Sequence, residues 1–138
     1  MEKGVFILGP ICIKDTGKYG RGLYATRDIE KDELIEVSPV IVLPKEDWGH
    51  LEKTSLLYYS FYWGEDDTAI ALGLGSLFNH SYTPNINYEN NIENLSIDFY
   101  ALHDISMGEQ LTINYNGDLE DKSPLWFDVI EETSYLHE

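Results

Sequence analysis

Apolar and polar residues alternate over short segments in the first 115 positions of the chain, with glycine, proline and asparagine between the segments. This pattern predicts short strands separated by turns, and therefore a mostly β fold. The expected strands cover residues 5–8, 22–26, 34–43, 58–63, 68–72, 87–89 and 95–102. In the last segment every second residue from Leu95 to Ala101 is apolar, which is the period of a strand with one buried face. The last two segments flank an asparagine-rich turn and predict a hairpin.

Two segments leave alternatives open. The strand expected over 34–43 contains Pro39, which has no N–H to donate to a neighbouring strand. A central strand would lose a hydrogen bond there, so we expect an edge strand, a bulge or a bend. Residues 47–57 show no clear period, and a short helix is one interpretation.

The pattern changes after Tyr115, where acidic residues predominate. Ser123 and Pro124 form a typical helix start, with a capping hydroxyl followed by proline at the first helical position. The apolar residues after them fall on one helical face: Leu125, Trp126, Val129 and Ile130. We therefore expect one domain over residues 1–118. Residues 119–138 should form an acidic tail with a short helix that packs on this domain or on a second subunit of a homodimer.

Charge narrows the classes of function. Twenty-five acidic residues against nine basic ones give a net charge of −16, which argues against binding nucleic-acid phosphates or an anionic membrane. A basic protein partner is compatible with this charge, and so is plain solubility. The N-terminus has no signal-peptide pattern, and no apolar stretch reaches about 20 residues. We expect a soluble intracellular protein.

Metal sites are not expected. Cys12 is the single cysteine, which excludes intramolecular disulfides and zinc sites built from several cysteines. The four histidines include no pair at the spacing of a helical zinc site. Asn114, Asn116 and Asp118 loosely resemble a calcium loop, but the glycine is misplaced and the closing glutamate is missing.

Three segments carry candidate chemistry. Residues 18–23 (KYGRGL) form a glycine-rich turn before a strand, which indicates either a tight bend or a close backbone approach to a ligand. Residues 77–85 (LFNHSYTPN) place polar groups directly after an apolar run. They form either a plain surface loop or a set of donors and acceptors suited to adenine or an amino-acid head group. Residues 108–115 (GEQLTINY) are a turn into a strand that ends in tyrosine. Without a function, Tyr115 would be an aromatic residue at a strand end whose hydroxyl contacts water.

Together these segments resemble the SET domain, the fold of many protein lysine methyltransferases. The matching residues are 20–25, 78–81, 84–85, 101–105, 108–112 and Tyr115. The resemblance extends from about residue 14 to residue 118. It implies several short curved sheets with a knot-like threading of the C-terminal motif, an exception to ordinary topology.

The resemblance also implies an activity, the transfer of a methyl group from S-adenosylmethionine to the side-chain amine of a lysine in a protein. Backbone atoms of Gly20, Arg21 and Gly22 would then contact the cofactor. The Asn79 side chain would hold its methionine part, and the His80 backbone would read its adenine.

The substrate lysine of such an enzyme enters through a narrow channel on the opposite side. Tyr115 matches the tyrosine where channel and cofactor meet, and Tyr59 resembles a second channel tyrosine. Ile113 stands where a larger aromatic residue often limits the number of methyl groups, so a smaller residue favours multiple methylation. A lysine with its ordinary pKa of about 10.4 arrives at the channel as a charged ammonium, and a dry channel lowers that pKa by disfavouring the charged form. The acidic surface favours a lysine within a basic segment.

Some features depart from the family pattern. Tyr82 stands where many relatives have cysteine, and no cysteine cluster follows Tyr115, so the zinc-binding segment that closes the channel in many relatives is absent. Trp126 and Phe127 of the tail, or a second subunit, are candidates for that task. Two alternatives stay open: a non-catalytic SET-like module that binds a peptide or the cofactor, and an acidic interaction protein that imitates nucleic acid.

Overall fold

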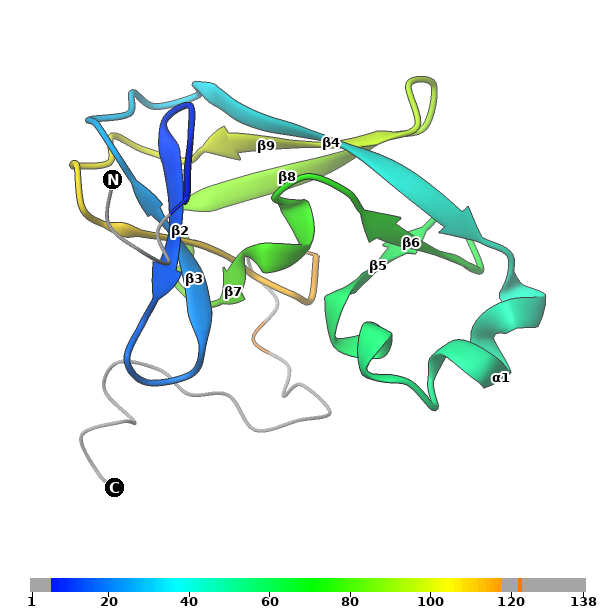
Figure 1. Ribbon diagram of the computed structural model, residues 1–138. Coiled ribbons are helices and arrows are strands. Elements are labelled where there is room, and N and C mark those ends of the chain that lie inside the picture. The colour runs from blue at the N-terminus through cyan, green and yellow to red at the C-terminus, as the bar shows by residue number, and fades with distance from the viewer. Residues whose placement is uncertain (1–5, 118–121, 123–138) are drawn as a thin grey trace.

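The computed structural model describes residues 6–117 and residue 122, and within them strands form two five-stranded sheets (Figure 1). The strands are β1 (Phe6–Leu8), β2 (Ile11–Asp15), β3 (Arg21–Ala25), β4 (Leu34–Leu43), β5 (Ser60–Trp63), β6 (Asp67–Ala71), β7 (Asn79–His80), β8 (Ile86–Asn91), β9 (Ser96–Ala101) and β10 (Gln110–Ile113). The helical segments are η1 (Lys45–Asp47), α1 (Trp48–Leu51), η2 (Ser55–Tyr59) and η3 (Gly75–Leu77). The predicted mostly β fold and the short helix near residue 50 are confirmed.

The first sheet brings the three candidate segments together. Its order is β1-β2-β3-β10-β7, in which β10 pairs antiparallel with β3 and parallel with β7. The parallel pairing sets Thr112 opposite Asn79 and Ile113 opposite His80. The strand that leads to Tyr115 therefore lies between the glycine-turn strand and the asparagine-histidine segment.

The second sheet has the order β5-β6-β4-β9-β8, in which β5 pairs with β6, and the predicted hairpin of β8 and β9 is confirmed. Residues 58 and 59, expected in a strand, belong instead to η2.

Of the three alternatives expected for residues 34–43, the edge strand is wrong, because β4 lies in the centre of the second sheet. Pro39 is the last residue of β4 paired with β9, and pairing with β6 begins at Val40. The Pro39 carbonyl accepts from the Leu72 N–H, so the proline nitrogen also faces that side, just past the last residue of β6. The missing N–H therefore falls at the end of the β4–β6 ladder, just beyond its last pair, Val40 with Ala71. The bulge in β4 lies between Leu34 and Glu36.

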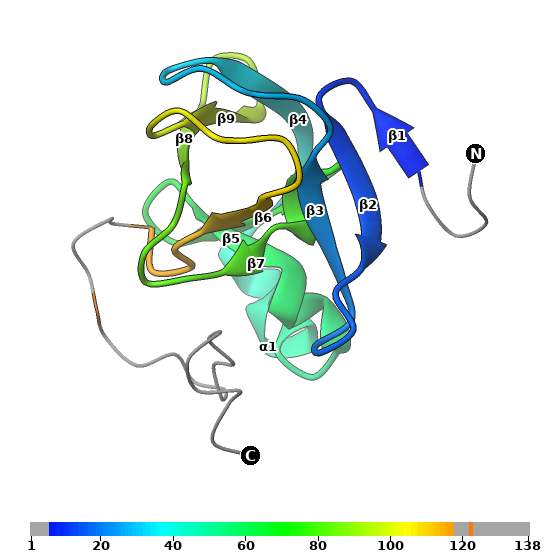
Figure 2. The ribbon, with the colours of Figure 1, turned by 90° about the vertical axis from the view of Figure 1, so that its left-hand side faces the viewer.

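Both sheets curl around one interior and share a hydrophobic core (Figure 2). Ile97, Phe99 and Ala101 are buried there, as their alternation predicts. Leu95 does not follow the pattern, since it is 53% exposed and has a φ of 52° in the turn before β9. The Phe78 and Phe99 rings stack in the core with their centroids 4.5 Å apart.

The remaining expectations about the fold concern the tail and the membrane. The helix predicted to begin at Ser123 lies outside the described residues, and the boundary at residue 118 and the knot-like threading stay predictions. In the described part of the chain, no helix has the length and apolar character needed to cross a membrane. Residues 6–117 and 122 also contain no group of three or more histidine, cysteine, aspartate or glutamate side chains placed to hold a metal ion.

Candidate active site

The glycine turn and Asn79 meet at the edge where β3, β10 and β7 lie side by side. The Asn79 side-chain nitrogen donates to the Arg21 carbonyl at 3.0 Å and to Oε1 of Gln110 at 2.9 Å. A Cβ atom on Gly22 would lie 2.7 Å from that Oε1 and 2.8 Å from the Asn79 nitrogen, so a side chain there would displace the Gln110 and Asn79 side chains from this arrangement. Gly20 has a φ of 89°, a conformation that L side chains rarely adopt. Gly20 is therefore favoured by its backbone conformation, and Gly22 by the close approach of the Asn79 and Gln110 side chains.

His80 holds the backbone at the point where β10 ends. Its Nδ1 accepts from the N–H of Tyr115 at 3.0 Å. Burial and, second, the charge of Lys122 lower the His80 pKa to about 4, so the ring is neutral at pH 7 and carries its hydrogen on Nε2. Among the described residues, that buried Nε2 has no hydrogen-bond partner. The imidazole packs between the rings of Tyr82 and Tyr115, with centroids 4.4 and 5.1 Å away.

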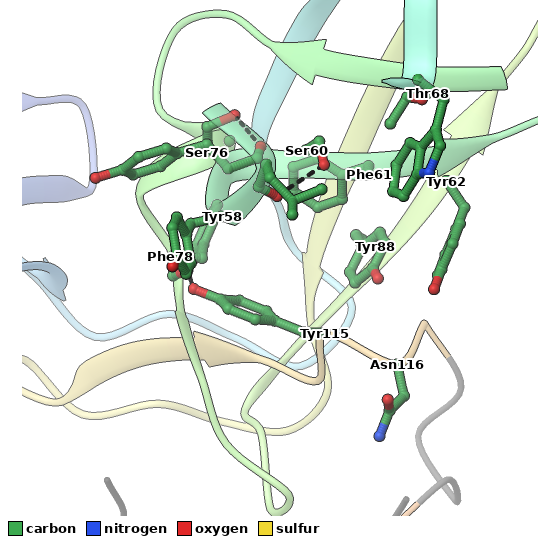
Figure 3. A pocket seen from close by; sticks show the side chains of 14 residues that line it. Tyr58, Ser60, Phe61, Tyr62, Thr68, Ser76, Phe78, Tyr88, Tyr115 and Asn116 are labelled. Carbon is green, nitrogen blue, oxygen red and sulfur yellow. Dashed lines mark hydrogen bonds between the residues drawn. The ribbon is translucent and has the colours of Figure 1, made fainter. Parts of the chain in front are cut away.

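An aromatic cavity of about 320 Å³ opens beside this edge (Figure 3). Its walls come from α1, η2, β5, β6, η3, β8 and the residues after β10. The lining residues are Trp48, Leu57, Tyr58, Tyr59, Ser60, Phe61, Tyr62, Thr68, Gly75, Ser76, Phe78, Tyr88, Tyr115 and Asn116. None of these side chains carries a formal charge, so the cavity can lower the pKa of an amine that enters it by desolvating the ammonium form.

Tyr115 forms part of the cavity wall, and its ring extends toward Phe78 (Figure 3). Its hydroxyl donates to the Phe78 carbonyl at 2.6 Å. Burial raises the Tyr115 pKa well above its usual range, and the nearby phenols of Tyr59 and Tyr88 add to the shift. The group is therefore a neutral phenol at physiological pH, with its proton directed at a carbonyl.

Tyr88 on β8 is a cavity residue that the sequence interpretation missed. Burial and, second, Tyr62 raise its pKa to about 12, so it too stays neutral. Its ring meets Phe61 edge-on at 5.3 Å, and its hydroxyl makes a long contact of 3.4 Å to the Asn114 carbonyl. Ile86 is fully buried, and Tyr88 follows two residues later on the same strand face. That alternation was the signal available in the sequence.

The other two residues expected at the channel differ in position. Tyr59 lines the cavity, is 45% exposed, and accepts through its carbonyl from the Ser76 hydroxyl at 3.0 Å. Ile113 is fully buried in the hydrophobic core and is not among the lining residues. Its effect on the number of methyl groups stays a prediction.

Comparison with known proteins agrees with this arrangement. The chain matches the SET domain family over residues 20–116. It is 39% identical over 123 residues to a histone-lysine N-methyltransferase, H3 lysine-37 specific, of Schizosaccharomyces pombe, covering 88% of this chain and 80% of that relative. A crystal structure of a Plasmodium falciparum protein described as a candidate histone methyltransferase superposes with a TM-score of 0.62 and 28% identity, over 79% of this chain and 95% of the other. The chain belongs to the SET domain family.

Proposed function

We propose that this protein uses S-adenosylmethionine to methylate a lysine in a histone. Its family and its 39% identity to a histone-lysine N-methyltransferase make it a protein-lysine N-methyltransferase. The cofactor, the histone and the roles of individual residues are the finer parts of the proposal. One observation carries them: the β7–β10 pairing sets the asparagine-histidine segment directly beside the strand that delivers Tyr115 to an aromatic cavity.

The chain's residues fit the cofactor. The turn leaves Gly20 and Arg21 exposed, with open space beside Gly20, whereas Gly22 is buried against the Asn79 and Gln110 side chains. Backbone atoms of Gly20, Arg21 and Gly22 would contact the cofactor, Asn79 would bind its amino-acid part, and the His80 backbone would bind adenine. When bound, S-adenosylmethionine supplies an electrophilic methyl group on a sulfonium.

The cavity residues prepare the lysine. An aromatic wall without formal charge favours the neutral amine over the ammonium form, and only the neutral amine can attack. Tyr115 cannot act as a strong base, because its raised pKa keeps it protonated. We assign it an orienting and electrostatic role, with its oxygen accepting from the amine while its own proton points at Phe78. Tyr59 and Tyr88 would line the path of the lysine side chain.

The C-terminal tail is a candidate cover for this site. The Lys122 ammonium donates to the Tyr82 carbonyl, so this one tail residue lies beside the loop next to His80. Residues such as Trp126 and Phe127 are too apolar to be left in water without a partner surface. We propose that the tail, or a second subunit that it engages, completes the closure.

A histone is the substrate class that fits best. The relative in Schizosaccharomyces pombe is named for H3 lysine-37, and the net charge of −16 favours a lysine in a basic segment. An extended peptide would leave one side chain free to enter the cavity. A histone substrate also implies that the enzyme works in the nucleus.

The test uses full-length protein, recombinant histone H3 and radiolabelled S-adenosylmethionine. We expect label on wild-type H3 and a large loss of label when its lysine-37 is replaced by arginine. Equal labelling of both H3 proteins would show that lysine-37 is not the methylated residue. Cofactor binding without labelling of any histone would support the non-catalytic alternative instead.

A further inference from the structure

We propose that Gln110 is a positioning residue, which orients the Asn79 amide so that its oxygen, and not its nitrogen, is presented to the amino group of the bound methyl donor. The inference rests on the proposed function, because it takes S-adenosylmethionine as the ligand. It assigns a task to a residue that lies neither in the cavity nor among the groups expected to touch the cofactor.

The orientation of the Asn79 amide follows from its neighbours. A backbone carbonyl can only accept, so the side-chain atom 3.0 Å from the Arg21 carbonyl must be the nitrogen. The second hydrogen of that nitrogen goes to Oε1 of Gln110 at 2.9 Å. Both donor positions are then occupied by protein, and the half-exposed side chain has only its acceptor, Oδ1, left for a ligand.

Gln110 is itself held in one orientation. Because Asn79 presents an NH₂ group, the Gln110 atom that faces it is the acceptor Oε1, and the Gln110 Nε2 donates to the Tyr19 hydroxyl at 2.7 Å. Its backbone is fixed by pairing with Tyr24 on β3 and by a 2.8 Å hydrogen bond from the Asn85 amide to its carbonyl. A reversed Gln110 amide would set one NH₂ group against another.

The relay therefore runs from Tyr19 in the glycine turn, through Gln110 on β10, to Asn79 on β7. An amide oxygen accepts a charge-assisted hydrogen bond from an ammonium group and repels a carboxylate. The amino-acid part of S-adenosylmethionine carries both groups. A fixed Oδ1 thus selects the amino end of the ligand, and Gln110 supplies the selection indirectly.

The experiment measures binding of S-adenosylhomocysteine, which keeps the amino-acid part, by calorimetry on the full chain. Gln110→Leu introduces an apolar side chain of similar size, which can neither accept nor donate. Gln110→Glu is the matched control, since one carboxylate oxygen still accepts from Asn79 and the other accepts from Tyr19. We expect affinity to fall about tenfold in Gln110→Leu and to stay within about twofold of wild type in Gln110→Glu.

A double-substitution cycle separates positioning from general damage. If Gln110 acts through Asn79, Gln110→Leu weakens wild type but has no further effect in an Asn79→Ala background. Losses that simply multiply in the double variant, or wild-type affinity in Gln110→Leu, would overturn the inference. Should Gln110→Leu fail to fold in a thermal melt, Gln110→Met, which keeps the unbranched length without the amide, replaces it in the same cycle, with the same two outcomes decisive. Wild-type protein that does not bind S-adenosylhomocysteine would instead contradict the proposed function.

Discussion

Replacing Tyr115 by phenylalanine removes one oxygen atom from the proposed transfer site and leaves the ring in place. The lost hydroxyl donates to the Phe78 carbonyl at 2.6 Å, and Phe78 is only 1% exposed, so a largely buried acceptor loses its side-chain donor. An unsatisfied buried acceptor of this kind costs about 1–2 kcal/mol. For a chain of this length that corresponds to a decrease of about 4 °C per kcal/mol in the melting temperature. The variant should therefore be measurably less stable but folded.

The effect on catalysis should be larger than the effect on stability. Losing one orienting or electrostatic contact commonly lowers a rate by roughly ten- to a thousandfold. We expect this loss in single-turnover methylation at saturating cofactor, with S-adenosylhomocysteine affinity nearly unchanged. Tyr100→Phe is the control, since the Tyr100 hydroxyl donates to Glu89 at 3.3 Å and lies outside the cavity lining. A folded Tyr115→Phe variant at wild-type rate, or a loss confined to cofactor affinity, would refute the role of Tyr115.

Three further predictions follow from the same geometry. Gly22→Ala should weaken S-adenosylhomocysteine binding about tenfold, because its Cβ would lie under 3 Å from the Asn79 and Gln110 side chains. Gly49→Ala is the control, since Gly49 has open space around it. Equal affinities of the two variants would contradict the close approach at Gly22. The His80 pKa of about 4 lies below its ordinary 6.5, so the unfolded chain binds the proton first and the free energy of unfolding should fall as pH drops from about 6.5 to 4. Because the ring is partly exposed, we expect the free energy of unfolding at pH 5 to be only about 1 kcal/mol lower than at pH 7, as measured by urea unfolding. The dependence on pH should be weaker in His80→Asn, and an equal dependence in both proteins would exclude His80 as the cause. Deleting residues 119–138 should lower activity, and a truncated chain with full activity and unchanged mass in solution would show that the tail is dispensable.

Local pattern predicted most of the strands. Segments with a period of two became β5, β6, β8 and β9, because in each of them one face is buried in a shared core. The prediction that Leu95 lies on the buried face of β9 is wrong, because the alternating pattern extends into the turn before the strand. The edge strand expected at Pro39 is wrong because a proline is tolerated in a central strand at the point where the pairing with a neighbouring strand ends. The length of a neighbouring strand cannot be inferred from the local sequence.

The candidate site was predicted less completely than the fold. Asn79 and Tyr115 were identified from motifs, but their proximity depends on a parallel pairing between strands far apart in the chain, which no local period indicates. The contact of His80 with the Tyr115 N–H and the relay through Gln110 arise from that same pairing. Tyr88 was missed because a single aromatic residue on a half-buried strand is ordinarily part of a core.

Methyl transfer itself tests the central claim most directly. Full-length protein would be incubated with recombinant histone H3 and S-adenosylmethionine carrying a deuterated methyl group, and the H3 peptides would be analysed by mass spectrometry. The account predicts a deuterated methyl group on a lysine side chain, dependent on added cofactor and strongly reduced in Tyr115→Phe. Unmodified H3 after full incubation, from a folded protein that binds S-adenosylhomocysteine, would contradict the claim that this chain methylates a histone lysine.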